Sequence, residues 1–335
     1  MDQIAGLKIQ MMNRRKLARK GLEFTLMVVG ESGLGKSTLV NSLYDQQVYP
    51  NSEINDHEIK KTVEIHTFTV DIEDQGVKLK LTVVDTPGFG DSVNNSDRWK
   101  PIINYINEQY DNYFRDESGL NRRNLEDHRV HCCLYFISPS THGLRPIDIK
   151  FMKELHNLVN IIPVIAKADT LTRNEIKRLK QKVLQEIQEH RIQVFVPEVD
   201  EEDSPLVREM RSCVPYAVIG GDRLLEVNGK KIRGRQYPWG VVEVENKEHS
   251  DFLLLRQMMI QTHMQDLKDI TQEIHYENFR KMKLMETDKS VNGIGEAVDG
   301  QEQNKEILEK QIAEMQQKMA MLMAKLGEKE TGAVV

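Results

Sequence analysis

Cysteine is scarce in this 335-residue chain, which contains only Cys132, Cys133 and Cys213. The number is odd and the spacing fits no metal-ligand pattern, so we expect no cysteine metal site. Cys132 and Cys133 lie in the apolar run 132–137, which predicts buried free thiols. Free thiols favour a reducing compartment, and the expected one is the cytoplasm.

Long apolar runs are also missing from the sequence. No stretch approaches the roughly 20 apolar residues that a membrane-spanning helix needs. The N-terminus lacks an apolar segment long enough for a secretory signal. With 39% apolar and 29% charged residues, the composition is typical of a soluble globular protein with some solvated segments.

The first twenty residues carry a charge opposite to that of the whole chain. The net charge is −6, yet this tip sets one acidic residue, Asp2, against six cations: Lys8, Arg14, Arg15, Lys16, Arg19 and Lys20. A basic tip on an acidic body argues against nucleic-acid binding and leaves room for one local anionic partner. The alternative is the solvated face of an N-terminal helix.

Short apolar runs alternate with amphipathic stretches from residue 24 onward. The pattern predicts strands at 24–29, 63–72, 77–84, 130–137, 161–165, 194–196 and 216–219, and helices at 146–158 and from Thr172. Thr172 and Glu175 have the spacing of a capping box. This alternation favours a mainly parallel sheet with helices on both faces.

The pattern changes after residue 220. A hairpin is predicted at 224–235, then a strand at 241–244 and an amphipathic helix from about 251. Further on, a heptad seam of about three repeats predicts a short coiled coil, with Leu308, Ile312, Met315, Met319, Leu322 and Leu326 in its core positions. We therefore expect a basic segment at 1–20, a nucleotide-binding domain at 21–285 with an added element at about 220–280, a linker at 286–303 and the coiled coil at 304–328.

The segment 30–37 reads GESGLGKS, which matches the phosphate-loop pattern in full. A predicted strand precedes it and helix-compatible sequence follows. Glycines allow backbone N–H groups to point at phosphates, Lys36 can reach the outer phosphates, and the Ser37 hydroxyl can bind Mg²⁺. The expected contacts come from Gly30, Glu31, Ser32, Gly33, Leu34, Gly35, Lys36, Ser37 and Thr38.

Two further motifs follow at strand ends. Asp85 begins the sequence DTPG, and an aspartate there can hold Mg²⁺ through water while Gly88 approaches a γ-phosphate. Asp169 ends the sequence AKAD, and its carboxylate can accept hydrogen bonds from guanine N1–H and the exocyclic amine. Adenine lacks that pair of donors, so Asp169 predicts GTP rather than ATP. The usual motif begins with Asn, whereas Ala166 stands here.

The ordered motifs GESGLGKS, DTPGFGD and AKAD, together with the block 231–244 and the segments 116–122 and 135–139, resemble the septin family. The likeness covers about 21–279. It implies an α/β fold, a three-layer P-loop GTPase domain with a mainly parallel sheet, a septin-specific C-terminal extension and a short coiled coil. It also implies a GTP/GDP and Mg²⁺ site and polymerisation with other septin subunits into filaments at the cell cortex and in dividing cells.

The resemblance implies roles for further residues. Additional nucleotide contacts are expected from Lys167, Ala168, Thr170, Glu175, Gly220 and Arg235, and His142 and Trp239 are expected at the nucleotide-side interface between subunits. A core aromatic remains the alternative for Trp239, and an exposed loop histidine for His142. The basic residues Arg14, Arg15, Lys16, Arg19 and Lys20 match a phosphoinositide-binding segment in position.

Slow hydrolysis is expected because Phe89 stands where fast GTPases place a water-orienting glutamine. Thr62 matches the threonine that hydrolysing septins retain, so it is a predicted catalytic and Mg²⁺-binding residue beside Lys36 and Gly88. A plain β-strand threonine is its alternative. For the whole chain, a slowly hydrolysing filament subunit is favoured over a monomeric switch GTPase that signals to effectors.

Overall fold

The computed structural model describes residues 22–44, 48–49, 65–74, 77–86, 88, 99–119, 126–140, 142–199, 204–221, 223–227 and 229–292. The chain divides into two compact units, Met1–Arg280 and Lys281–Val335. The basic segment 1–20, Thr62 and the predicted coiled coil at 304–328 lie outside the described residues. None of the described helices is long and apolar enough to cross a membrane.

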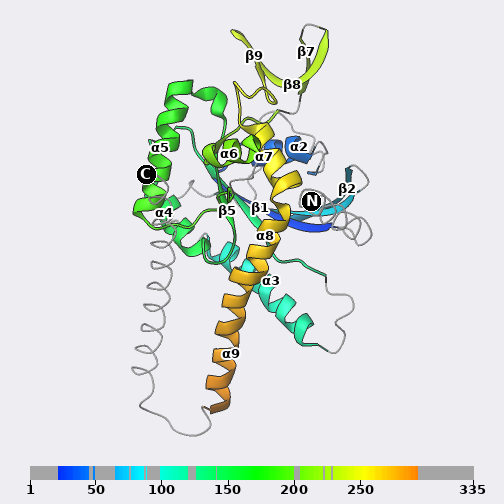
Figure 1. The fold of residues 1–335 in the computed structure, drawn as a ribbon, viewed down its shortest axis with the longest axis vertical. Helices are drawn as coiled ribbons and strands as arrows, with labels where there is room; N and C mark the ends of the chain where they lie inside the picture. Colours follow the sequence, from blue (N-terminus) through cyan, green and yellow to red (C-terminus); the bar gives the residue numbers. More distant parts are fainter. Residues whose placement is uncertain are drawn as a thin grey trace, which may run out of the picture. The chain divides into compact units, whose positions relative to one another are not determined.

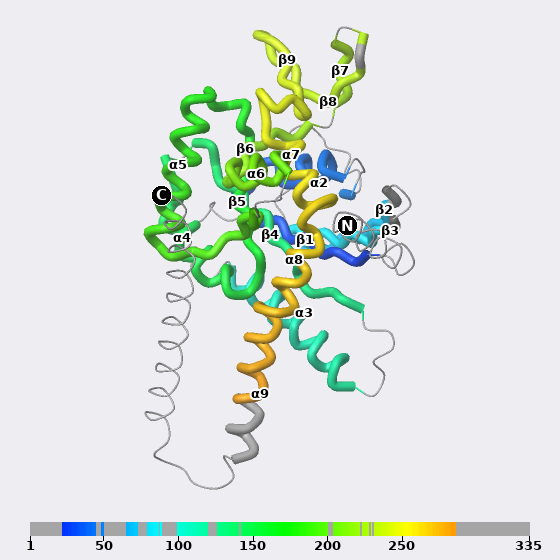
Figure 2. Tube along the Cα trace, viewed as in Figure 1, coloured from blue at the N-terminus to red at the C-terminus, as the bar shows by residue number. Residues whose placement is uncertain are grey.

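A six-stranded sheet organises the first unit. Its strands are β1 (Leu22–Gly30), β2 (His66–Asp74), β3 (Val77–Asp85), β4 (Cys132–Ile137), β5 (Ile161–Ile165) and β6 (Tyr216–Ala217). Their order is β2-β3-β1-β4-β5-β6, and every neighbouring pair except β2–β3 is parallel. Figure 2 shows β2 and β3 on one side of β1, and β5 and β6 on the other. The predicted mainly parallel α/β sheet is confirmed.

Burial explains why these runs form strands. Every residue of β4 and β5 is buried, as expected of parallel strands that are covered on both faces. Cys132 and Cys133 are among them and are free thiols, as predicted. The edge strand β2 instead alternates half-buried Phe68, Val70 and Ile72 with exposed neighbours, which is the period of a sheet with one solvated face.

Helices connect and flank the strands. They are α2 (Lys36–Tyr44), α3 (Lys100–Ser118), α4 (Pro146–Leu155), α5 (Arg173–Glu189), α6 (Pro205–Ser212), α7 (Phe252–Gln257), α8 (Met264–Ile270) and α9 (Glu277–Asn292), with a short 3₁₀ turn, η2 (Ala168–Thr170). Figure 1 shows α4 and α5 beside β5. The predicted capping box is present at α5, where Thr172 and Glu175 bond reciprocally.

Three details differ from the sequence-based expectation. The run 194–196 is not a strand, because it contributes a single ladder-like bond, from Phe195 N to Ile161 O at 2.8 Å. Helices α3 and α6 had no counterpart among the predicted elements. The last helix, α9, extends to Asn292, into the stretch predicted as a linker.

A second, three-stranded sheet follows β6. It consists of β7 (Arg223–Val227), β8 (Lys230–Tyr237) and β9 (Gly240–Glu243), all antiparallel. The predicted hairpin is therefore confirmed, and the predicted third strand pairs with it. Figure 1 shows this sheet at the end of the unit where α2, α6 and α7 lie.

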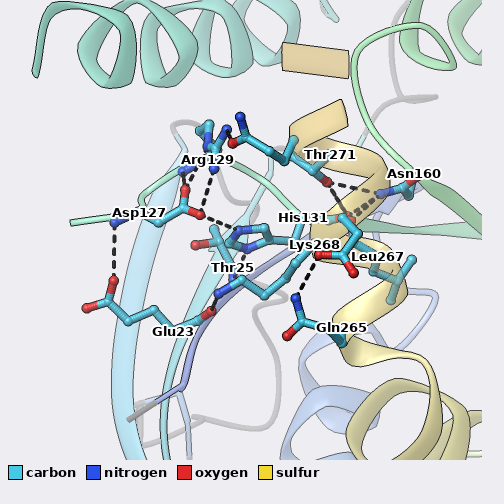
Figure 3. A network of polar contacts seen from close by, with 12 residues as sticks. Glu23, Thr25, Asp127, Arg129, His131, Asn160, Gln265, Leu267, Lys268 and Thr271 are labelled. Carbon is cyan, nitrogen blue, oxygen red and sulfur yellow. Dashed lines mark hydrogen bonds and ion pairs between the residues drawn. The ribbon is translucent and has the colours of Figure 1, made fainter. Parts of the chain in front are cut away.

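Two π-helical segments, η3 (Met258–Thr262) and η4 (Thr271–Tyr276), interrupt the C-terminal helices. At the second, the Asn160 amide donates to the carbonyls of Leu267 and His131, and the Thr271 hydroxyl also donates to Leu267 O at 2.7 Å. These side chains compete for a helix carbonyl, which is a recognised cause of local widening. Figure 3 shows Asn160 and Thr271 meeting beside His131.

The same region contains a buried ionic network (Figure 3). The Arg129 guanidinium donates two hydrogen bonds to the Asp127 carboxylate, at 2.8 and 2.9 Å, and lies 3.6 Å from the Tyr113 ring centroid. His131 Nδ1 accepts from Thr25 N at 2.9 Å, so its proton sits on Nε2, which pairs with Asp127 Oδ2 at 3.1 Å. Burial alone would raise the pKa of Asp127, yet hydrogen bonds from His131 and Arg129 hold it well below its usual range.

Burial lowers the pKa of His131, which predicts a stability that depends on pH. In the unfolded chain this histidine becomes protonated below about pH 6.5, whereas in the folded chain it becomes protonated only at lower pH. The free energy of unfolding should therefore fall on acidification below about pH 6.5, by up to about 1.4 kcal/mol per pH unit for one histidine. His131→Asn should reduce that slope in urea titrations between pH 7 and pH 5.

Thr271→Val is the matched control. It removes a hydroxyl from the same network but no titratable group, so stability should drop equally at every pH. A slope in His131→Asn equal to that of the wild type would contradict the assignment.

Candidate active site

The predicted phosphate, magnesium and base loops that the structure describes lie at the carboxyl edge of the parallel strands. The register aligns Val28 with Asp85, Gly30 with Phe136 and Ile165 with Ala217. The segments 30–37, 85–88, 166–170 and 218–221 therefore begin side by side. This edge is where open α/β sheets bind their ligands.

The phosphate loop starts where β1 comes unusually close to β4. A Cβ on Gly30 would lie 2.6 Å from Phe136 Cβ, so no larger residue fits there. Gly33 and Gly35 adopt φ values of +79° and +83°, and a Cβ on either would point into open space. Left-handed glycines beside open space suit a loop whose backbone N–H groups face phosphates.

Lys36 spans this loop. Its Nζ donates to the carbonyls of Gly30 at 3.2 Å and Glu31 at 3.0 Å, which holds the ammonium under the loop. Burial lowers the pKa of Lys36, and the charges of Asp85 and Glu31 oppose that shift. The side chain is thus a partly desolvated cation within the influence of the Asp85 carboxylate.

The segment after β3 packs directly on the loop. The buried Thr86 hydroxyl donates to Val28 O at 2.9 Å, and a Cβ on Gly88 would lie 2.6 Å from Ser32 N. Asp85 is buried, and Ser37 lies exposed in the first turn of α2. Burial, followed by the charge of Asp85, raises the pKa of the Tyr49 phenol, which was not a predicted site residue.

Backbone bonds brace the segment that carries Asp169. Lys167 is left-handed, with φ +48°, and Ala168 N donates to Val218 O at 3.1 Å. Ala166 N donates to Ile137 O at 3.0 Å. These main-chain contacts hold the turn where the usual motif has an asparagine side chain. A non-glycine residue in the left-handed region is common at functional sites.

The side chain of Asp169 has no exposed surface, and its hydrogen-bond donors come from the second sheet. Its Oδ2 accepts from Arg235 Nη1 at 2.8 Å and from the Tyr237 hydroxyl, while its Oδ1 has no hydrogen-bond partner within the described residues. A buried acceptor with no partner suits a ligand that donates hydrogen bonds. The donor pair of guanine fits this chemistry.

A cavity of about 460 Å³ lies between the phosphate loop and β8. That volume is within the range of about 300–1,000 Å³ typical of ligand sites. Seven predicted site residues line it: Gly33, Leu34, Gly35, Thr38, Lys167, Gly220 and Arg235. Gly220 is close to α2, because a Cβ there would lie 3.0 Å from Leu39 N.

Other predicted residues lie on the surface. Thr170 and Glu175 are exposed, and the Glu175 carboxylate is bonded to Thr172 at the start of α5. His142 is an exposed loop residue, and Trp239 is 70% exposed, so the core alternative for Trp239 is wrong. The predicted roles of these four residues stay predictions.

An ion pair connects the loop that contains His142 to the phosphate loop. Arg145 donates to Glu31 Oε2 at 2.9 Å and to the buried Asp148, which also accepts from the Tyr135 hydroxyl. Sequence reasoning missed Arg145, Tyr49 and Tyr237. The motif block containing Tyr237 was visible, but the contacts of all three residues are non-local.

The edge loops, the Lys36 bracing and the buried Asp169 define a P-loop GTPase type of domain. A family model described as Septin matches residues 20–293. The chain belongs to the septin family.

Individual relatives agree. The chain is 54% identical to Septin-2B of Xenopus tropicalis, covering 92% of this chain and 87% of that protein, and 53% identical to Septin-2 of Rattus norvegicus, covering 93% and 87%. A crystal structure of the septin GTPase domain from Chlamydomonas reinhardtii superposes with a TM-score of 0.61 at 27% identity, over 78% of this chain and 99% of that one. The sequence is that of the septin 2-like group.

Gly88→Ala tests the close packing on the phosphate loop. The added methyl group must displace the Ser32 backbone, and overpacking of this kind costs about 1–3 kcal/mol. We expect affinity for a fluorescent GDP analogue to fall about tenfold or more. Gly119→Ala at the end of α3, where the nearest atom lies 3.3 Å from the new Cβ, is the control. Equal affinities for the two variants would contradict the packing argument.

Proposed function

We propose that this chain is a guanine-nucleotide-binding septin subunit that hydrolyses GTP slowly and assembles with other septin subunits into cytoskeletal filaments. The observation that best supports the proposal is the exposure of the Trp239 side chain. This large aromatic is 70% exposed beside the strand whose Arg235 and Tyr237 bind Asp169. Tryptophans are enriched at the centres of protein–protein interfaces, where they carry much of the binding energy. A nucleotide site with such a residue at its rim favours a filament subunit, in which this surface contacts another subunit, over a monomeric switch GTPase.

The chain's own residues fit guanine nucleotide and Mg²⁺. The positive-φ glycines and Lys36 would hold phosphates, Asp169 the base, and Arg235, Gly220 and Lys167 the walls around it. Ser37 and Asp85, with Thr62, would hold Mg²⁺, which binds proteins through few side chains and completes its shell with phosphates and water. Mg²⁺ bound there would neutralise part of the negative charge of the phosphates.

Slow turnover follows from the residues that would face the γ-phosphate. Lys36 and the Gly88 backbone stabilise charge, and no glutamine follows Gly88 to orient water. Thr62 is the proposed residue that orients the attacking water.

Thr62→Gly should therefore abolish phosphate release while GTP binding persists. Single-turnover phosphate release and equilibrium binding, measured on the same preparation, check this. Unchanged turnover would remove Thr62 from the mechanism.

Two contacts would build the filament. We propose that His142 and Trp239 lie in the contact across the nucleotide cavities, and that the second contact uses the terminal segments. The proposed location is the cytoplasm, in filaments at the cell cortex and cleavage furrow, with a role in cytokinesis and membrane scaffolding.

Extraction of nucleotide from the purified full-length chain, followed by sedimentation at low and high salt, tests the proposal. We expect bound GDP or GTP and polymers that form at low salt, alone or with other septin subunits. A particle that stays monomeric or dimeric at low salt would instead indicate a switch GTPase. Extracted adenine nucleotide would overturn the guanine assignment.

We further propose that Arg14, Arg15, Lys16, Arg19 and Lys20 contact anionic phosphoinositide membranes, where each cation adds about 1 kcal/mol. The wild type should co-sediment with liposomes that contain phosphoinositide. A variant with these five residues changed to Gln should stay in the supernatant. Equal binding of both proteins would assign the segment to a solvated face.

A further inference from the structure

Asp169 receives two hydrogen bonds on one oxygen from alternate positions of one strand. Arg235 Nη1 donates to Oδ2 at 2.8 Å, and the Tyr237 hydroxyl donates to the same atom. Residues two apart on a strand share a face, which explains why both side chains of β8 reach Asp169. The other oxygen, Oδ1, is buried and has no hydrogen-bond partner within the described ranges.

Guanine needs acceptor sites on both oxygens of this carboxylate, and the hydrogen bonds from Arg235 and Tyr237 already occupy Oδ2. Its N1–H and exocyclic amine lie side by side, about as far apart as the two oxygens of a carboxylate, so each donates to a different oxygen. A carboxylate oxygen accepts about two hydrogen bonds, so Oδ1 has room while Oδ2 is already filled. Base binding therefore requires one donor to leave Oδ2.

The leaving donor should be Tyr237. The Arg235 bond is charge-assisted, and such bonds are about twice as strong as neutral ones. Burial, followed by the hydrogen bond to Asp169, raises the pKa of Tyr237, so the phenol is a neutral donor at physiological pH. The weaker, uncharged bond is the one that guanine can replace.

The ring of Tyr237 connects the hydrogen bond at Asp169 to the exposed Trp239. It stacks face to face on Trp239, with centroids 4.8 Å apart and an interplanar angle of 5°. Trp239 is 70% exposed, so its position is set largely by this stack. A phenol that moves away from Asp169 must slide or tilt beneath the indole.

We infer that Tyr237 is a positioning residue that couples guanine binding at Asp169 to the orientation of Trp239 on the subunit surface. This inference rests on the proposed function, because it assumes that Asp169 binds guanine and that Trp239 meets another subunit. Coupling is reciprocal, so a partner that fixes Trp239 should change GDP affinity by the same factor by which GDP changes partner affinity.

The chain offers a built-in reporter. It has two tryptophans, and the other, Trp99, is 6% exposed, stacked on Phe151 and bonded to Glu154. Trp99→Phe, or Trp99→Tyr if the first fails to fold, leaves Trp239 as the sole indole. Tyr237→Phe in that background keeps the stacking ring and removes only the hydroxyl. Tyr110→Phe is the matched control, since its hydroxyl bonds to Leu158 O, outside the nucleotide site.

The experiment adds GDP to nucleotide-free, full-length protein at a concentration where sedimentation velocity shows a single species. The Trp99→Phe protein should show a shift in Trp239 emission with GDP and none with ADP. The shift should be lost in Trp99→Phe/Tyr237→Phe, which still binds a fluorescent GDP analogue, and kept in Trp99→Phe/Tyr110→Phe. An equal shift with and without the Tyr237 hydroxyl would overturn the coupling, as would GDP binding with no shift in any variant.

Failure of the proposed function gives a different result. In that case the Trp99→Phe protein itself, with Tyr237 intact, would not bind the GDP analogue.

Discussion

Asp169 is a carboxylate with no exposed surface, and the arrangement of the nucleotide side depends on how its charge is met. An unpaired buried charge costs several kcal/mol, so donors must come from another part of the chain. Arg235 and Tyr237 provide them from β8. The small sheet is thereby held against the carboxyl end of β5, and it forms one wall of the cavity.

At the opposite end of the central sheet, buried charged groups are also paired. Asp127, Arg129 and His131 pair their charges and polar atoms beside the start of β1, where Lys268 also donates to Glu23 O at 2.8 Å (Figure 3). Strand β1 therefore begins in an ionic network that fixes the C-terminal helices and ends in the phosphate loop. Its position is determined at both ends by polar contacts, and in between by complete burial of its side chains.

Local signals explain what the sequence could predict. The phosphate loop, the capping box at Thr172 and the strands of the parallel sheet depend on glycine positions, side-chain caps and apolar runs, all visible within about ten residues. The run 194–196 has the same apolar signal but makes a single ladder-like bond, from Phe195 N to Ile161 O, whereas β6 is the strand that pairs with β5, at Val164 and Ile165. The partnership of Asp169 with Tyr237 joins residues 68 positions apart, and that of Glu31 with Arg145 joins residues 114 apart, so neither had a local signal.

The proposed function depends most on guanine recognition, in which the Asp169 carboxylate accepts hydrogen bonds from the guanine N1–H and exocyclic amine. The most direct measurement compares GDP and xanthosine diphosphate binding to the wild type and to Asp169→Asn. Xanthine has a carbonyl where guanine has the amine, so an amide that both accepts and donates matches it. We predict that the wild type prefers GDP and that the variant prefers xanthosine diphosphate. A variant that keeps the wild-type affinity for GDP would contradict this prediction.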